Sequence, residues 1–565
     1  MSDKPKKIVV VGGVAGGATL ATRLRRLSEK AEIVLLERGQ YISYANCGLP
    51  YYAGGLIRER AKVLLLSPEQ MRADYSIDLR LGHEATGIDR AGKTVWVTPS
   101  GAEPYDESYD ILVLAPGASP HRPDIPGADS ARVTTLWTVP EADFIRDKLD
   151  RGLKKAILIG AGPIGLELAE TLAGHGAEVH LVQRGRQVMN TLDMELAGLV
   201  HRRLREKGVQ LHLGQEVKAF MDEVDGVVVS LSGGKRLKGD FAVLGVGVRP
   251  NVAFARAAGL EVGERGGLVV DSAMRTSDPF IYAVGDAVEV KDFVFGESAL
   301  YQLAGPVATQ TRVAAANIMR TNPGGEGDKF SGTQGTGICK VFDLALAVTG
   351  HNETALRKRG LVNGHDYHSA VLVARSHASY YPGAQTLALK LLFSPDGKKL
   401  YGAQAVGAEG ADKRIDVLAT AMRLGAGITE LQELELAYAP PYSSPKDPVN
   451  LLGNVAQNVM DGLARFCDWD APEQADETGS NPVFLDIRSD KSRSTYPLAG
   501  SINIGMEEIR SRLDELPRER KIITICETGL GAYETARILM LHGFKNVWVY
   551  PGGVYLYRAT HEQPA

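Results

Sequence analysis

The chain has 565 residues, of which 44% are hydrophobic and 23% charged, which is the ordinary composition of a globular protein. This length is too great for one hydrophobic core and predicts three or four domains. A net charge of −4 without a polybasic footprint argues against nucleic acid and against an anionic membrane as partners. The apolar run Ile8–Val11 is too short for a signal peptide or a membrane span, so we expect a cytoplasmic location.

The chain has only four cysteines, and they are far apart in the sequence: Cys47, Cys339, Cys467 and Cys526. This spacing forms neither a disulfide framework nor a metal-binding motif, and it agrees with a reducing compartment. Cys339 lies in a strand-like run and Cys467 beside a polar segment, and we expect both to be buried and structural.

The first forty residues have the pattern of a dinucleotide-binding βαβ unit. The apolar strand Ile8–Val11 is followed by the glycine turn 12–17, a helix, the strand 33–36 and the acid Glu37. Glycines let the backbone approach a pyrophosphate, the helix N-terminus supplies N–H donors, and the acid binds a ribose hydroxyl. Val14 stands where the motif usually has its middle glycine. The alternative to a dinucleotide site is a tight turn in an α/β domain that binds no ligand.

Cys47 lies in the segment Ser43–Pro50, ten residues after Glu37. A lone cysteine is commonly just a small buried hydrophobe. The position beside a predicted dinucleotide site favours a redox role instead. Since no second cysteine is near in the sequence, any partner of Cys47 in a disulfide must be external.

A second dinucleotide unit begins with the strand 156–159 and the full motif Gly160-x-Gly162-x-x-Gly165. Two dinucleotides on one chain predict hydride transfer between a nicotinamide and a flavin. The alternative is a structural duplication with one empty site.

Gln183 stands where an acid normally ends the second strand of such a unit, and Arg184 and Arg186 follow it. An acid would bind the ribose 2′-hydroxyl and repel a 2′-phosphate, whereas arginine accommodates the phosphate. The sequence therefore favours NADPH or dual use, unless these arginines simply face water.

The stretch Ser43-x-x-Asn46-Cys47-Gly48-Leu49-Pro50-Tyr51 resembles the coenzyme A disulfide reductases of the pyridine nucleotide-disulfide oxidoreductase superfamily. The segments 109–118, 245–251 and 276–286 carry the same resemblance. It implies an enzyme that binds FAD and NAD(P)H. The cofactor-binding residues it implies are Gly12, Gly13, Ala15, Gly16, Glu37, Arg38, Ala115, Gly117, Asp286 and Ala304 for FAD, and Gly160, Gly162, Gly165, Gln183, Arg184 and Gly247 for the nicotinamide dinucleotide.

The resemblance also implies a coenzyme A site. Arginine suits this ligand because its paired donors grip phosphate oxygens. A solvated basic helix face is the competing interpretation of the arginines. The implied contacts are Thr19, Arg23, Arg26, Ser43, Asn46 and Lys446.

Residues 326–455 alternate in a strand-like pattern and resemble the dimerisation domain of the superfamily, after a linker at 321–327. In that family one tyrosine from each of two loops reaches the partner subunit's cysteine, which by position gives Tyr380 and Tyr438. A phenol can hydrogen-bond or protonate a departing thiolate. The resemblance thus implies a homodimer with a shared active site. The alternative is that these tyrosines only pack against the prolines of their own loops.

After a polar, acidic linker at 456–480, the strand spacing resembles a single rhodanese domain whose loop is Cys526-Glu527-Thr528-Gly529-Leu530-Gly531. Loop N–H groups and a helix N-terminus would lower the pKa of the Cys526 thiol and cradle a persulfide. Gly531 stands where related loops carry arginine, so a degenerate docking domain remains the alternative.

Together these features predict an α/β protein with two Rossmann-like domains, an α+β dimerisation domain and a C-terminal α/β rhodanese domain. The function they predict is an NAD(P)H-dependent reductase of coenzyme A disulfide or persulfide in which Cys47 attacks the S–S bond and Cys526 handles sulfane sulfur. A peroxidase or oxidase that uses a Cys47 sulfenic acid, and a non-catalytic redox sensor or sulfur carrier, remain open. The predicted boundaries are 1–120 with 250–325 for FAD, 121–249 for NAD(P), 326–455 for dimerisation, 456–480 for the linker and 481–565 for rhodanese.

Overall fold

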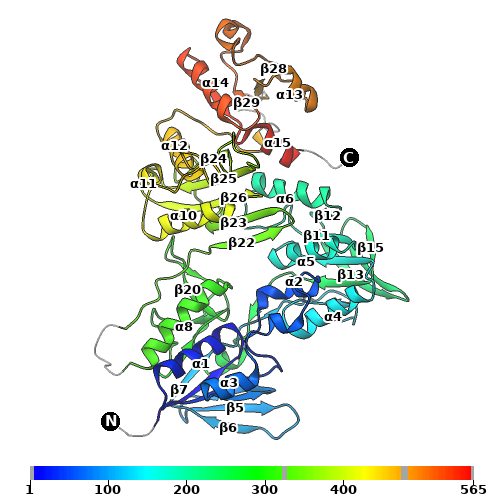
Figure 1. Ribbon diagram of the computed structural model, residues 1–565, viewed down its shortest axis with the longest axis vertical. Coiled ribbons are helices and arrows are strands. Elements are labelled where there is room, and N and C mark those ends of the chain that lie inside the picture. The colour runs from blue at the N-terminus through cyan, green and yellow to red at the C-terminus, as the bar shows by residue number, and fades with distance from the viewer. Residues whose placement is uncertain (1–4, 321–326, 472–480, 562–565) are drawn as a thin grey trace. The chain divides into compact units, whose positions relative to one another are not determined.

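The computed structural model describes residues 5–320, 327–471 and 481–561 (Figure 1). The chain divides into two compact units, Met1–Arg184 with Gly214–Thr333 and Gly185–Leu213 with Gln334–Ala565. Parallel and antiparallel sheets with helices occur in both, which confirms the predicted mixed α/β class. Most of the linker predicted at 321–327 and the end of that predicted at 456–480 lie outside the described residues. None of the described helices is long and apolar enough to cross a membrane.

The first unit contains a parallel sheet in the order β19-β7-β1-β2-β3. Its central strand β1 is fully buried from Ile8 to Val10, because a parallel strand covered on both faces must be apolar throughout. Helices α1 and α8 lie side by side against this sheet (Figure 1). The elements are β1 (Lys7–Val11), α1 (Ala15–Leu27), β2 (Glu32–Glu37), β3 (Asp78–Leu81), β7 (Ile111–Leu114), β19 (Ile281–Ala283) and α8 (Ala304–Ile318).

A second parallel sheet in this unit contains β11, β10, β16 and β9 in that order. The antiparallel strands β13, β14 and β15 pack on it through one apolar cluster. The glycine turn after β10 leads directly into α5, as the motif predicted. The elements are β9 (Val133–Thr134), α4 (Val139–Asp150), β10 (Lys155–Ile159), α5 (Pro163–Gly174), β11 (Glu178–Gln183), β13 (Val217–Glu223), β14 (Gly226–Leu231), β15 (Arg236–Gly239) and β16 (Phe241–Leu244).

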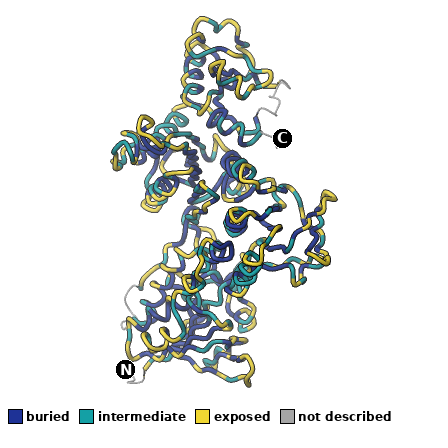
Figure 2. Tube along the Cα trace, turned by 45° about the vertical axis from the view of Figure 1, so that its right-hand side comes forward, coloured by how far each residue is buried: buried dark blue, intermediate teal, exposed yellow. Residues whose placement is uncertain are grey.

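The second unit contains an antiparallel sheet in the order β22-β23-β26-β25-β24. Most residues of β25 and β26 are buried, and Figure 2 colours buried residues dark blue and exposed ones yellow along the chain. Helices α10 and α12 pack against the sheet, and α11 packs against α12. The elements are β22 (Gly337–Val341), β23 (Leu344–Gly350), β24 (His368–Arg375), β25 (Thr386–Phe393), β26 (Leu400–Gly407), α10 (Ala411–Arg423), α11 (Ile428–Glu433) and α12 (Pro448–Met460).

The C-terminal part of this unit is a parallel sheet, β28-β27-β29-β30. Its helix α15 packs on α6 so closely that a Cβ on Gly198 would lie 2.4 Å from the carbonyl oxygen of Ala559. The elements are α6 (Met194–Glu206), β27 (Val483–Asp486), β28 (Ile502–Asn503), β29 (Ile522–Ile525), α14 (Leu530–Leu541), β30 (Val547–Val549) and α15 (Gly553–His561).

The segment predicted as a linker from residue 456 is ordered in its first part. Helix α12 continues to Met460, and the Cys467 amide donates to Val549 O at 3.2 Å. Cys467 and Cys339 are both buried, as predicted. Burial raises the pKa of Cys467 to about 12, so this thiol stays protonated and inert.

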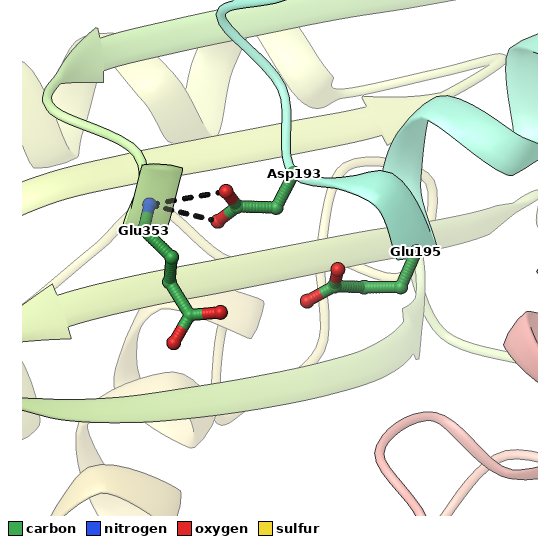
Figure 3. Close-up of side chains that lie close together, drawn as sticks. All are labelled: Asp193, Glu195 and Glu353. Carbon is green, nitrogen blue, oxygen red and sulfur yellow. Dashed lines mark hydrogen bonds between the residues drawn. The ribbon is translucent and has the colours of Figure 1, made fainter. Parts of the chain in front are cut away.

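Three carboxylates of the second unit converge in the manner of a metal site: the buried Asp193 and Glu195 and the partly buried Glu353 (Figure 3). The ammonium of Lys390 already occupies the space between them, at 2.9, 2.5 and 2.9 Å. Burial alone would lower the pKa of Lys390, but the three carboxylates raise it well above its ordinary value. This cluster is a buried ion-pair network that joins α6, β25 and α9 (Glu353–Lys358), and it needs no metal.

We predict that Lys390→Met destabilises the second unit by about 3–5 kcal/mol, because it leaves buried charges without a counter-ion. Without the ammonium, the folded carboxylates would have pKa values above those of the unfolded chain. The folded state would then bind more protons, so the loss should be smaller at pH 5 than at pH 8. Urea unfolding at both pH values measures this, with Lys390→Met/Glu195→Gln as the partly rescued control. Equal stability of Lys390→Met and wild type at pH 8 would contradict the prediction.

Candidate functional site

Cys47 lies in the loop that follows β2, between a hydrogen-bonded bend and helix α2 (Leu49–Ala53). The Ser43 amide donates to Gly13 O at 2.9 Å, and Ser43 has a φ of +43°. These contacts hold the loop against the first glycine turn, with Asn46 and Cys47 in a single 3₁₀ turn. Cys47 is exposed and all four cysteines are free, so no disulfide involves Cys47 within the chain.

The surroundings of Cys47 do not favour a thiolate in the isolated chain. Desolvation raises the pKa of the Cys47 thiol, and the carboxylates of Glu167 and Asp286 raise it further. Glu167 is held by the Tyr51 hydroxyl, which donates to it at 3.0 Å. No sequence pattern predicts this effect, since Glu167 and Asp286 are distant from Cys47 along the chain.

The first glycine turn depends on a close approach between two strand ends. Gly12 has a φ of +98°, and a Cβ there would lie 2.1 Å from the carbonyl oxygen of Ala115. Glu37 accepts hydrogen bonds from the Gly13 and Gly39 amides, each at 2.7 Å. The structure thus brings together three predicted cofactor contacts, Gly12, Glu37 and Ala115, at one edge of the sheet.

Asp286 lies at the carboxyl end of β19, where burial raises the pKa of its carboxyl to about 6. Within the described residues its carboxylate makes no hydrogen bond, and burial alone is the cause of the raised pKa. A buried carboxylate without a partner is costly, and a hydroxyl group of a polyol chain would satisfy it. Asp286 therefore fits a contact to the ribityl chain of FAD. The other residues predicted to contact FAD lie in three places. Ala15 and Gly16 begin helix α1, and Ala304 begins α8. Arg38 is exposed and donates to Ser119 Oγ, and Gly117 has a φ of +62°.

The second glycine turn has the same geometry. A Cβ on Gly160 would lie 2.2 Å from Gly245 O, and one on Gly165 would lie 2.1 Å from Gly160 O. Gln183 Oε1 accepts from the Ala161 amide at 3.2 Å, so Gln183 reaches the turn as an acid would but brings no charge.

Other residues predicted for the second dinucleotide occupy the same region of the first unit. Gly162 caps α5, and Gly247 has a φ of +103°. Arg184 is exposed and makes no ion pair in the described part of the chain. Arg186 belongs to the second unit.

Helix α1 carries two kinds of arginine. Arg25 is buried and donates to the carbonyl oxygens of Tyr75 and Ser76, which makes it structural. Thr19, Arg23 and Arg26 share the other face at i, i+4 and i+7. Arg23 Nε is buried without a partner, and neither Arg23 nor Arg26 forms an ion pair with a described residue. The face predicted for coenzyme A therefore presents two cations that no described residue neutralises.

Tyr380 and Tyr438 come from separate loops of the second unit, yet their hydroxyl oxygens lie 3.0 Å apart. They are 73% and 45% exposed. The hydrogen bond to Tyr380 raises the pKa of Tyr438. Lys446, on the same loop as Tyr438, is also exposed. The two tyrosines predicted together are thus adjacent, on a unit other than that of Cys47.

Cys526 directly follows β29, and its Sγ accepts a hydrogen bond from the Gly529 amide at 3.1 Å. Gly529 has a φ of +113°, and a Cβ on Gly531 would lie 3.8 Å from the sulfur, so the loop passes close around it. The Val554 amide at the start of α15 donates to Cys526 O at 2.8 Å. One backbone donor thus reaches the sulfur, and the predicted persulfide cradle stays a prediction.

Two buried ion pairs beside these loops were missed from sequence. Arg488 donates to Asp486 at 2.8 Å and is two residues away from it, so the pattern Asp-x-Arg at a strand end could have signalled the pair. Arg414 donates to Asp447 at 2.9 Å across 33 residues, which no local pattern shows.

Comparison with known proteins identifies the family. Residues 6–315 match the pyridine nucleotide-disulphide oxidoreductase family, 336–447 its dimerisation domain and 471–560 the rhodanese-like domain. Coenzyme A disulfide reductases of Staphylococcus haemolyticus and Staphylococcus epidermidis are 34% and 35% identical to it, over 80% of this chain and all of theirs.

Solved structures extend the likeness to the C-terminal domain. A reduced CoADR-RHD of Bacillus anthracis is 42% identical, covers 98% of both chains and has a TM-score of 0.92. An NAD-dependent persulfide reductase of A. fulgidus is 38% identical, covers 97% of this chain and 99% of its own, and has a TM-score of 0.90. The chain therefore belongs to the pyridine nucleotide-disulphide oxidoreductase family, and it carries that family's dimerisation domain and a rhodanese-like domain.

Proposed function

We propose that this oxidoreductase uses NAD(P)H and FAD to reduce coenzyme A disulfide and coenzyme A persulfide at Cys47. The observation that carries the proposal is a free, exposed cysteine beside a dinucleotide turn. The nearby helix face that holds Arg23 and Arg26 suits the phosphates of coenzyme A. The relatives named as coenzyme A disulfide and persulfide reductases support the same substrate class.

The reaction begins with attack of the Cys47 sulfur on the S–S bond of the substrate. With coenzyme A disulfide, a Cys47–S–S–CoA bond forms and one coenzyme A thiolate leaves with a proton from solvent or a nearby acid. With coenzyme A persulfide, Cys47 attacks the outer sulfur, the S–S bond of the substrate breaks, coenzyme A leaves as its thiolate and Cys47 is left as a persulfide. Two electrons and the protons that accompany them then cleave the new S–S bond and release coenzyme A or sulfide.

Residues of the first unit hold the groups that supply those electrons. When bound, FAD accepts a hydride equivalent from NAD(P)H and makes two electrons available to sulfur. Glu37 and Asp286 bind hydroxyl groups of the flavin dinucleotide, and the Gly160 turn binds the pyrophosphate of the nicotinamide dinucleotide. Because its pKa is raised in the chain alone, the Cys47 thiol requires the bound cofactor or the partner subunit to favour its thiolate.

The tyrosine pair supplies the acid at a site shared between two subunits. The hydrogen-bonded Tyr380 and Tyr438 are exposed in one chain, and a homodimer would bring them to the partner's cysteine. The phenol of Tyr438 is protonated at neutral pH, as proton donation to a departing thiolate requires. Lys446 would meet a phosphate of coenzyme A.

Cys526 delivers sulfane sulfur to this reductase. The Gly529 amide at 3.1 Å from its sulfur is one donor of the cradle that a persulfide anion needs. Attack of the Cys526 thiolate on a polysulfide moves one sulfur onto the cysteine and releases the polysulfide one sulfur shorter. A coenzyme A thiolate then attacks this outer sulfur, forms coenzyme A persulfide and releases the Cys526 thiolate.

A water-forming NADH oxidase of Lactobacillus brevis is 26% identical and covers 81% of this chain with a TM-score of 0.76, so oxygen is a rival acceptor. The unneutralised arginines of α1 and the C-terminal domain have no purpose in an oxidase. Oxygen consumption that exceeds coenzyme A disulfide turnover would favour the oxidase.

Replacing Cys47 by serine removes the sulfur nucleophile. We expect Cys47→Ser to lower kcat for coenzyme A disulfide and coenzyme A persulfide by at least about 10³-fold, since loss of a nucleophile leaves only residual catalysis. Reduction of ferricyanide by NAD(P)H should persist, because it needs only the cofactors. NAD(P)H oxidation followed at 340 nm measures both. Full activity of Cys47→Ser would refute the proposed chemistry.

Cys526→Ser separates the two sulfur sites. We expect it to retain coenzyme A disulfide reduction and to lose stimulation of NAD(P)H oxidation by polysulfide in the presence of catalytic coenzyme A. Sulfide release measured with each substrate tests this. The matched control is Cys339→Ser in the same assays, because Cys339 is buried and distant from either loop in sequence. Unchanged polysulfide activity in Cys526→Ser would remove the transferase role.

Arg184 tests the choice of nicotinamide. If it binds a 2′-phosphate, Arg184→Ala loses one charge-assisted hydrogen bond, worth about 1.5–3 kcal/mol, or roughly tenfold to 100-fold in kcat/KM for NADPH. The kcat/KM for NADH should stay within about twofold, because NADH lacks that phosphate. Steady-state kinetics with NADH and NADPH measures both values of kcat/KM. An equal loss of kcat/KM for the two nucleotides would show that Arg184 simply faces water.

A further inference from the structure

The two tyrosine loops of the second unit are joined beneath the surface. The first loop, residues 376–385, carries Tyr380, and the second, residues 434–447, carries Tyr438. The Ala378 amide of the first loop donates to Ser443 O of the second at 3.0 Å. The tyrosine side chains themselves are exposed, so the backbones of these loops must set their relative position.

Arg414 of α10 links the same two loops. Its side chain is 2% exposed, and its Nη2 donates to Ser376 O of the first loop at 2.8 Å. The same guanidinium forms a two-point ion pair with Asp447 of the second loop, at 3.3 Å from Nε and 2.9 Å from Nη2. A planar guanidinium can hold two partners in fixed directions at once, which a lysine ammonium does less well.

The partners of Arg414 are themselves fixed. Asp447 caps α12 by accepting from the Val449 amide at 3.0 Å, and it also accepts from Ser443 Oγ at 2.6 Å. Burial would raise the pKa of Asp447, but these donors and Arg414 lower it, so the carboxylate stays charged. Gly410 leaves room for the guanidinium, because a Cβ there would lie 2.1 Å from Arg414 Nη1.

We propose that Arg414 is a positioning residue that joins the two tyrosine loops and thereby sets the contact between Tyr380 and Tyr438. This inference rests on the proposed role of the tyrosine pair as proton donor. A buried ion pair that served stability alone would have no need to contact both loops. Arg414 touches one loop four residues before Tyr380 and the other nine residues after Tyr438, so its loss lets the two hydroxyls separate.

The test uses Arg414→Gln, Tyr438→Phe and the double variant in the full-length holoenzyme with coenzyme A disulfide. We expect Arg414→Gln to lower kcat about 10- to 100-fold, as misplacement of a catalytic group does. The KM for NAD(P)H and the rate of flavin reduction by NAD(P)H should not change. Since Arg414 acts through the tyrosines, the double variant should be no slower than Tyr438→Phe.

Two further variants separate positioning from stability. Gly410→Ala displaces the guanidinium without removing its charge and should lower kcat as Arg414→Gln does. Lys390→Met breaks another buried ion-pair network of the same unit and should keep kcat per folded enzyme. Losses that multiply in the double variant, or an unchanged kcat in both Arg414→Gln and Gly410→Ala, would overturn the inference. Full activity of Tyr380→Phe and Tyr438→Phe would instead remove the proposed role of the tyrosines, and the inference with it, while leaving Cys47 untouched.

Discussion

The close approach of two strand ends at Gly12 is the constraint on which the first unit depends. A Cβ there would lie 2.1 Å from Ala115 O, so β1 and β7 can end side by side only with glycine at this point. That contact brings the turn to Glu37, and the Gly13 carbonyl then anchors Ser43 and with it the Cys47 loop. One backbone contact therefore links the dinucleotide turn to the reactive sulfur.

The same constraint recurs at Gly160, where the second turn meets Gly245. What differs is the residue that closes the turn, a buried carboxylate in Glu37 and an uncharged amide in Gln183. Both side chains accept a hydrogen bond from the turn, so the fold is preserved while the charge offered to the ligand changes. A glutamine here keeps the structural contact of an acid without its repulsion of a 2′-phosphate.

Features carried by local sequence could be predicted, whereas those built by long-range contacts could not. The glycine turns, the strand before each of them and the Cys526 loop are each set within about ten residues, and the structure has them where the motifs placed them. The Lys390 network joins residues up to 197 positions apart, and Arg414 meets Asp447 across 33. Burial of these charges depends on how sheets and helices pack, and a lysine or an arginine in a sequence does not reveal its partners.

The two sulfur sites are built on opposite electrostatic principles. Cys526 receives a backbone N–H at 3.1 Å, a donor that stabilises negative charge on sulfur without an external group. Cys47 has two carboxylates as its electrostatic neighbours, and its pKa is raised. The first arrangement suits a negatively charged sulfur, and the second opposes one. The carboxylates near Cys47 therefore disfavour its thiolate, and a protonated thiol is a poor nucleophile.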